Sequence, residues 1–182
     1  TWCNAPNLFA AAGCPSAMEL ESVAVHRLEL PMNGSYEIAG AVTSSLESAL
    51  VVLEAADGTR GIGTADPVPG HPIPQDVDGI VDGLADDLLP AVLDAAPSTP
   101  NELLGVLESV PGQANAGSAV EMAFLDRYCR RRGQSLADFF GGALRSTERL
   151  NAWVGIDDPA AMAAEAREWG GRGVDALKMK IA

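Results

Sequence analysis

Apolar and polar positions alternate in the first third of the chain, which predicts β-strands. Residues 22–31 alternate in this way, and residues 48–56 and 59–65 are two further short runs rich in β-formers. Asp57-Gly58 joins the last two runs, and this dipeptide supplies the positive φ angles of a two-residue hairpin turn. We therefore expect a three-stranded antiparallel meander.

Two segments around these strands have the composition of loops. Residues 32–45 are punctuated by Gly and Ser, and residues 66–74 hold four prolines in nine positions. Proline fixes φ and removes a backbone donor, so the second segment is expected to be a stiff, exposed loop.

From Asp76 onward the hydrophobic period becomes helical. A second helix is expected over about residues 101–110. A third is expected to begin near Ser118, whose spacing to Glu121 matches a capping box, and to end at the arginines 130–132.

The last forty residues change from extended to helical and back to extended. Residues 149–154 and 174–181 have strand patterns, and between them Asp158 and Pro159 are a cap and a first helical residue. Gly170-Gly171 ends that helix. Strand, helix and strand make one βαβ unit, the repeating element of parallel sheets and barrels.

Lys178 and Lys180 are the only lysines in the chain, and they share one face of the last predicted strand. The opposite face is apolar and suits an outer helix layer. Mutual repulsion and partial burial lower the pKa of paired lysines, which lets one act as a base near neutral pH. The alternative is a pair of ordinary lysines on a solvent-facing strand edge.

Charge and cysteine content exclude several classes of function. The chain of 182 residues has 25 acidic and 12 basic side chains, a net charge of −13, so nucleic acids and anionic membranes are not expected partners. No apolar run approaches the roughly 20 residues of a membrane span. Cys3, Cys14 and Cys129 show neither a disulfide framework nor zinc spacing, which favours a cytoplasmic setting.

Three segments carry a resemblance to a known family. SAVEMAFLDRYCRRRGQSLADFFGG (residues 118–142), GGRGVDALKMKIA (170–182) and LVVLEAADGTRGIGTA (50–65) are similar to segments of the enolase superfamily, in the mandelate racemase and muconate lactonizing enzyme branch. The resemblance covers about residues 18–182. Ser135 stands where this family usually has Pro.

This resemblance implies a fold and a chemistry. Residues 18–140 would form an α+β capping domain, preceded by a tail over residues 1–17. Residues 141–182 would form the first βαβ of a (β/α)8 TIM-like barrel, which is incomplete because a closed barrel needs about 250 residues. Family enzymes remove the proton α to a carboxylate with the help of Mg²⁺. Lys180 would then be the acid/base group and Lys178 would tune it, with the metal ligands expected beyond Ala182.

The resemblance also implies a small carboxylate substrate and two lid segments, which match residues 32–45 and 66–74. Tyr36, Ile38 and His71 are the candidates for contact with this substrate, the alternative being that they are ordinary loop side chains. We expect neither nucleic acid nor membrane as a partner, and we expect a homo-oligomer.

Three functions stay open from the sequence. One is a Mg²⁺-dependent racemase, epimerase or cycloisomerase, and another is an acid-sugar or hydroxy-acid dehydratase with the same chemistry. The third is a noncatalytic interaction module derived from the cap domain. On either enzymatic interpretation, the 182-residue chain alone is expected to be inactive.

Overall fold

The structure, a computed structural model, describes residues 20–38, 41–67 and 76–181. The chain divides into two compact units. The first contains the residues up to Pro31 together with Ser45–Gly142, and the second contains Met32–Ser44 and Ala143–Ala182. The tail expected over residues 1–17 lies outside the described residues.

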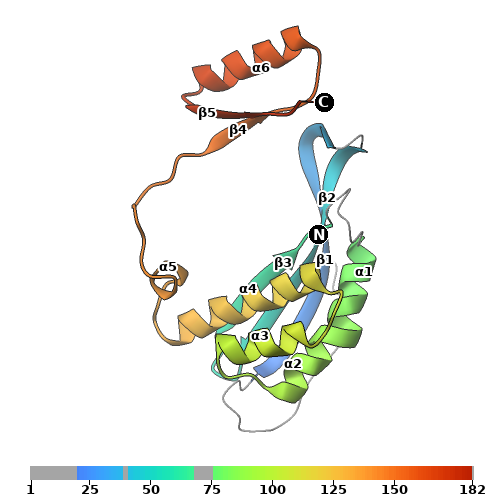
Figure 1. Cartoon of the computed structure of the whole chain (residues 1–182), viewed down its shortest axis with the longest axis vertical. Helices are drawn as coiled ribbons and strands as arrows, with labels where there is room; N and C mark the ends of the chain where they lie inside the picture. The colour runs from blue at the N-terminus through green and yellow to red at the C-terminus, as the bar shows by residue number, and fades with distance from the viewer. Residues whose placement is uncertain (1–19, 39–40, 68–75, 182) are drawn as a thin grey trace. The chain divides into compact units, whose positions relative to one another are not determined.

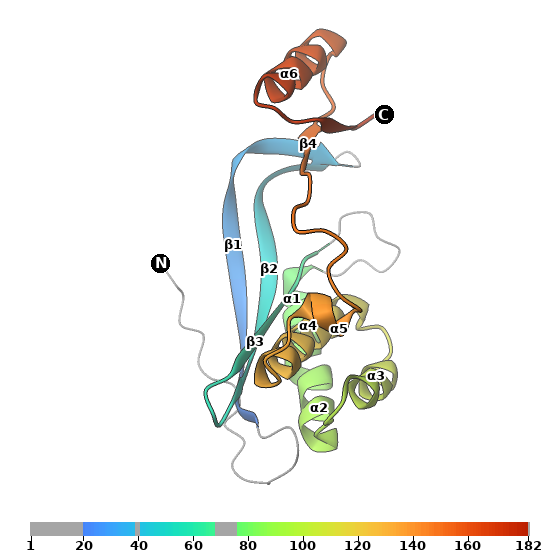
Figure 2. The same cartoon turned by 90° about the vertical axis from the view of Figure 1, so that its left-hand side faces the viewer.

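An antiparallel sheet of three strands forms the first part of the fold (Figures 1 and 2). The strands are β1 (Leu20–Ile38), β2 (Ala41–Ala55) and β3 (Arg60–Ala65), in the order β1-β2-β3. The expected meander is therefore confirmed.

The first two strands of the meander run further than the sequence predicted. Residues 32–45 were expected to form a loop, and this is wrong, because β1 continues to Ile38 and β2 resumes at Ala41. Pro31 lies within β1. A proline is tolerated there because β1 is at the end of the sheet order, where one side of the strand needs no ladder partner.

The turn between β2 and β3 has three residues rather than two. Ala55 pairs with Thr59, with the Ala55 N–H donating to the Thr59 carbonyl at 3.0 Å. Gly58 has a φ of +78°, while Asp57 is not in the positive region and accepts a bond from the Thr59 N–H instead. A three-residue loop of this kind needs one left-handed residue, and glycine supplies it.

Helices cover one face of this sheet (Figure 2). They are α1 (Val77–Asp82), the π-helical turn η1 (Gly83–Leu88), α2 (Leu89–Ala95), α3 (Pro100–Glu108), α4 (Ala114–Arg131) and the short α5 (Leu136–Phe139).

The caps of these helices follow the sequence in part. The helical period expected from Asp76 onward agrees with the start of α1, and the Asp76 carboxylate caps this helix. The prediction of a capping box at Ser118 is wrong, because α4 begins one turn earlier. The Ser118 hydroxyl donates to the Asn115 carbonyl within this helix. Ser135 caps α5 by accepting from the Asp138 N–H at 3.0 Å.

The core of the capping region lies between the sheet and helices α1–α4. Its largest fully buried members are the following side chains: Phe124, Leu53, Ile80, Leu84, Leu88, Leu89, Leu103, Val51, Val92 and Val120. Cys129 is buried as well, and burial raises the pKa of its thiol.

Helix α4 approaches β3 so closely that two glycines are required. A Cβ on Gly61 would lie 2.0 Å from the Ala123 carbonyl oxygen, and one on Gly63 would lie 1.9 Å from that of Ala119. These are backbone atoms that cannot move aside, so the contact distance is set by the main chains themselves.

The βαβ unit expected at the end of the chain is also present. Strand β4 (Asn151–Val154) pairs in parallel with β5 (Ala176–Met179), and α6 (Pro159–Gly171) connects them (Figure 1). Across the described ranges, no helix has the length and apolar character to cross a membrane.

Candidate functional site

The βαβ unit is built by local signals at its turns. The Asp158 carboxylate accepts bonds from the N–H groups of Ala160 and Ala161, which starts α6. At the other end of the unit, Arg149 forms an ion pair with Asp175 at 2.9 Å, just before the two strands begin to pair. These contacts hold β4 and β5 in a single parallel register.

The two faces of this strand pair differ in character. Ala152 and Val154 are buried on the face that α6 contacts, with Val154 fully so. Trp153 and its register partner Lys178 lie on the opposite face, as alternation along a strand requires. The separation of an apolar face from a lysine face is the one that the sequence predicted.

Lys180 lies immediately after β5 and is held by the neighbouring strand. Its backbone N–H donates to the Val154 carbonyl at 3.1 Å. Its side chain is half-buried, whereas Lys178 is exposed. Lys178 and Lys180 are therefore two residues apart on the same face, near the C-terminal end of the parallel strands.

Both ammonium groups lie near the ring of Trp153. The Nζ atom of Lys178 lies 4.7 Å from the centroid of the Trp153 ring, and that of Lys180 lies 5.0 Å from it. Sequence reasoning missed Trp153 because its place beside Lys178 depends on the register between two strands. Matching the apolar faces of residues 149–154 and 174–181 leaves registers that differ by two residues open, so it does not place Trp153 beside Lys178.

The candidate substrate residues are only partly placed. Tyr36 and Ile38 lie in β1, and His71 lies outside the described residues. Their contact with a substrate stays a prediction.

The described residues do not fit a Mg²⁺ ion. Within residues 20–38, 41–67 and 76–181 no three His, Cys, Asp or Glu side chains form a group that could hold a metal. The acidic groups near the lysines have other contacts: Asp158 caps α6, Asp157 accepts from the Asp158 N–H, and Asp175 pairs with Arg149.

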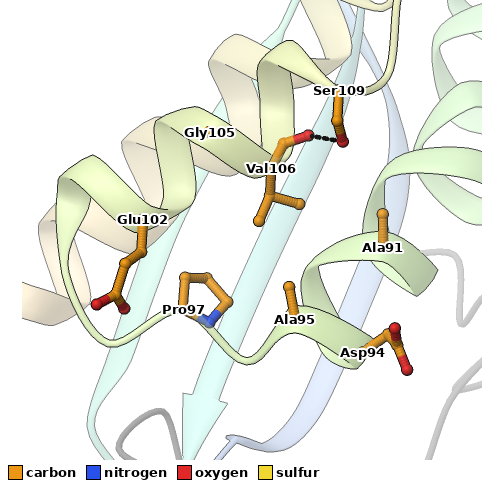
Figure 3. A pocket seen from close by; sticks show the side chains of 8 residues that line it. All are labelled: Ala91, Asp94, Ala95, Pro97, Glu102, Gly105, Val106 and Ser109. Atoms are coloured by element: carbon orange, nitrogen blue, oxygen red, sulfur yellow. Dashed lines mark hydrogen bonds between the residues drawn. The ribbon is translucent and has the colours of Figure 1, made fainter.

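A separate pocket of about 490 Å³ lies between α2 and α3 (Figure 3). Its lining includes two carboxylates, Asp94 and Glu102. Glu102 accepts bonds from both the N–H and the hydroxyl of Ser98, and these bonds lower the pKa of its carboxyl. This carboxylate thus organises the start of α3. The hydroxyl in the lining, that of Ser109, donates to the Val106 carbonyl at 2.6 Å, and the lining contains no basic side chain.

An α+β capping region followed by a parallel βαβ unit with two lysines at its strand ends defines the class of the protein. A sequence model described as "Mandelate racemase / muconate lactonizing enzyme, N-terminal domain" matches residues 22–141. The chain belongs to this family, within the enolase superfamily.

Its relatives of known activity are mainly epimerases. The chain is 26% identical over 164 residues to an aromatic dipeptide epimerase of Herpetosiphon aurantiacus, covering 90% of this chain and 45% of that protein. It is 26% identical over 168 residues to the L-Ala-D/L-Glu epimerase of Bacillus subtilis, covering 90% and 44%. The chain therefore spans a little under half the length of these relatives.

Solved structures agree with the fold. The substrate-liganded L-Ala-D/L-Glu epimerase from Bacillus subtilis matches with a TM-score of 0.78 at 25% identity, over 90% of this chain and 45% of that one. Muconate lactonizing enzyme from Pseudomonas fluorescens matches with a TM-score of 0.80 at 25% identity, over 91% and 46%. A structure from Roseovarius nubinhibens, 24% identical and similar in fold, is complexed with magnesium.

Proposed function

We propose that this chain supplies the capping domain and first barrel strands of an epimerase or racemase, with Lys180 as an acid/base group. The observation that carries the proposal is the convergence of Lys178 and Lys180 at the C-terminal end of a parallel strand pair. In barrels built from such units, reacting groups come from the C-terminal ends of the strands.

The proposed step is a proton transfer at the carbon next to a carboxylate. The neutral amine of Lys180 takes the α-proton, and the electron pair of the broken C–H bond moves into the carboxylate of the substrate. Return of a proton to the opposite face of that carbon inverts it, which requires a second acid/base group outside the described residues. Lys178 would favour the anionic substrate by its charge.

Mg²⁺ remains part of the proposal as a cofactor of the whole enzyme. Because the described residues do not fit the ion, its ligands would have to lie elsewhere in the protein. No step of the lysine chemistry above is assigned to the metal.

We propose dipeptides as the first substrates to test. Support comes from the two relatives named for dipeptide substrates, which match 90% of this chain at 26% identity. A dipeptide has a free carboxylate next to the carbon that would be deprotonated, as the proposed step requires.

The test is α-proton exchange in heavy water, on the longest natural protein that contains this chain. Dipeptides are incubated with Mg²⁺, and incorporation of deuterium at the α-carbon is followed by NMR. Replacing Lys180 by Ala is expected to reduce exchange by about 10²–10⁴-fold, the usual contribution of a general base.

Lys180→Arg is the matched variant. It keeps the positive charge but cannot lose its proton, so it is expected to be as inactive as Lys180→Ala. Exchange at the unsubstituted rate in either variant contradicts the role of Lys180. Absence of exchange in the unsubstituted protein with all dipeptides and hydroxy acids favours a noncatalytic interaction module.

A dehydratase is the second candidate, because one observation favours it. A stretch of 68 residues is 41% identical to the D-gluconate dehydratase of Thermoproteus tenax, although it covers only 36% of this chain. The same proton removal would then be followed by loss of a β-hydroxyl group. Formation of a keto acid from a sugar acid, without exchange into dipeptides, would favour this activity over epimerisation.

A further inference from the structure

One aromatic ring contacts both lysines of the candidate site. Lys178 and Lys180 are two residues apart, so their Cα atoms are separated by roughly 6–7 Å along the strand. Their Nζ atoms nevertheless lie at 4.7 and 5.0 Å from the same Trp153 centroid. Both distances are within the roughly 6 Å over which a cation is attracted to an aromatic face.

The register of the two strands explains how one ring contacts both side chains. Trp153 is directly opposite Lys178 in the parallel pair, and Lys180 is its diagonal neighbour on the same face. Directly opposite and diagonal neighbours are both within reach of a large aromatic side chain. The face of the indole carries negative charge density, which attracts each ammonium group.

Within residues 20–38, 41–67 and 76–181, no acidic side chain replaces the ring in this role. Among the ion pairs formed within the described ranges of the chain, none includes Lys178 or Lys180. A lysine side chain has a flexible stem of four carbons, and its ammonium group samples many positions unless something holds it. Trp153 has only two rotatable side-chain bonds and is anchored on β4.

We propose that Trp153 is a positioning residue, whose ring holds the ammonium groups of Lys178 and Lys180 on the lysine-bearing face of the β4–β5 pair. Its importance for catalysis rests on the proposed function of Lys180. The contact of Trp153 with the lysines does not depend on that function. The contact and the effect on catalysis are therefore tested separately.

The contact is tested by NMR of ¹³C-methylated lysines in the longest natural protein that contains the chain. Reductive methylation keeps the positive charge, and Lys178→Arg and Lys180→Arg assign the two signals. Methyl groups above an aromatic face are shifted upfield. We expect both signals to be upfield in the unsubstituted protein, to lose this shift in Trp153→Leu, and to keep most of it in Trp153→Phe.

Trp169→Leu is the matched control. Trp169 lies in α6 of the same unit and stacks with Arg172 at 4.9 Å, so the substitution removes an equivalent contact that involves no lysine. The lysine signals should not move in this variant. Circular dichroism shows that each variant is folded, and Trp153→Phe provides the comparison if Trp153→Leu is not.

The effect on the reaction is measured by the same exchange assay. Trp153→Leu is expected to lower kcat by about two- to fivefold, the range of a partly exposed cation–π contact, with a smaller change in KM. Trp153→Phe should restore most of the rate, because it restores an aromatic face.

The outcomes separate the two claims. Unshifted lysine signals in the unsubstituted protein, or signals that stay upfield in Trp153→Leu, overturn the contact whatever the activity. Equal exchange rates in the Leu and Phe variants overturn the positioning role. Upfield signals in a protein that exchanges no α-proton overturn the proposed function and leave the contact standing.

Discussion

The capping region and the βαβ unit differ in how much of each is buried. In the capping region the sheet and five helical segments enclose a continuous core, in which Leu53, Ile80 and Phe124 have at most 1% of their surface exposed. In the βαβ unit, α6 has no buried residue and only Ala152 and Val154 of β4 are buried. Stability and the candidate chemistry are therefore carried by different sets of residues.

This difference in burial indicates which substitutions should change the free energy of unfolding and which should not. Two strands and one helix bury too little apolar surface to be stable without further packing. Changes inside the capping core should lower the free energy of unfolding strongly, and the same changes in the βαβ unit should have small effects. Within this chain, the lysine pair lies in the unit with fewer buried residues.

A large effect is expected at the contact between β3 and α4. Gly63→Ala would place a Cβ against the Ala119 carbonyl, so the helix has to move away from the sheet. We expect the free energy of unfolding to fall by about 3 kcal/mol, measured by urea denaturation with circular dichroism.

Gly105→Ala is the control for this substitution, because nothing lies within 4 Å of the added Cβ and the position is inside α3. It should be neutral or stabilising by up to about 1 kcal/mol. Equal losses in the two variants would contradict the close approach of α4.

A matched pair of leucines compares the two regions directly. Leu53 is fully buried on β2, whereas Leu177 on β5 is 39% exposed. Leu53→Ala should cost about 2–5 kcal/mol of unfolding free energy. Leu177→Ala should cost about 0.5 kcal/mol, as surface substitutions do. A cost for Leu177→Ala as large as that for Leu53→Ala would show that β5 belongs to a buried core.

A local effect is expected at the start of α6. Asp158→Ala removes the acceptor for two backbone N–H groups and should cost about 1 kcal/mol of local helix stability. Amide hydrogen exchange at Ala160 and Ala161 should become faster. Glu165→Ala, at an exposed position within α6, is the control and should leave these amides unchanged.

Features set by neighbouring residues were predictable from the sequence. The meander, the βαβ unit, the start of α1 and the cap at Asp158 follow from alternation, helical periodicity and short polar side chains. Alternation along the strand also predicts that the lysines and the apolar side chains of the last strand lie on opposite faces.

Features set by distant residues were not predictable. Residues 32–38 contain breakers such as Asn and Gly and were interpreted as a loop, but pairing within the sheet overrides that local preference. Ser118 has the spacing of a capping box, yet α4 gains a further turn before it. Trp153 has no local signal, because its partner lies 25 positions away in the sequence.

The face of β3 that packs against α4 has almost no side chains, and this limits insertions and deletions in the strand. Its outward positions are Arg60, Ile62 and Thr64, and they alternate with residues that carry little or no side chain. Inserting or deleting one residue in this strand would turn the large side chains onto α4. Only a change of two residues would preserve the alternation, so length variation in this region is expected at the turn around Gly58 and not within β3.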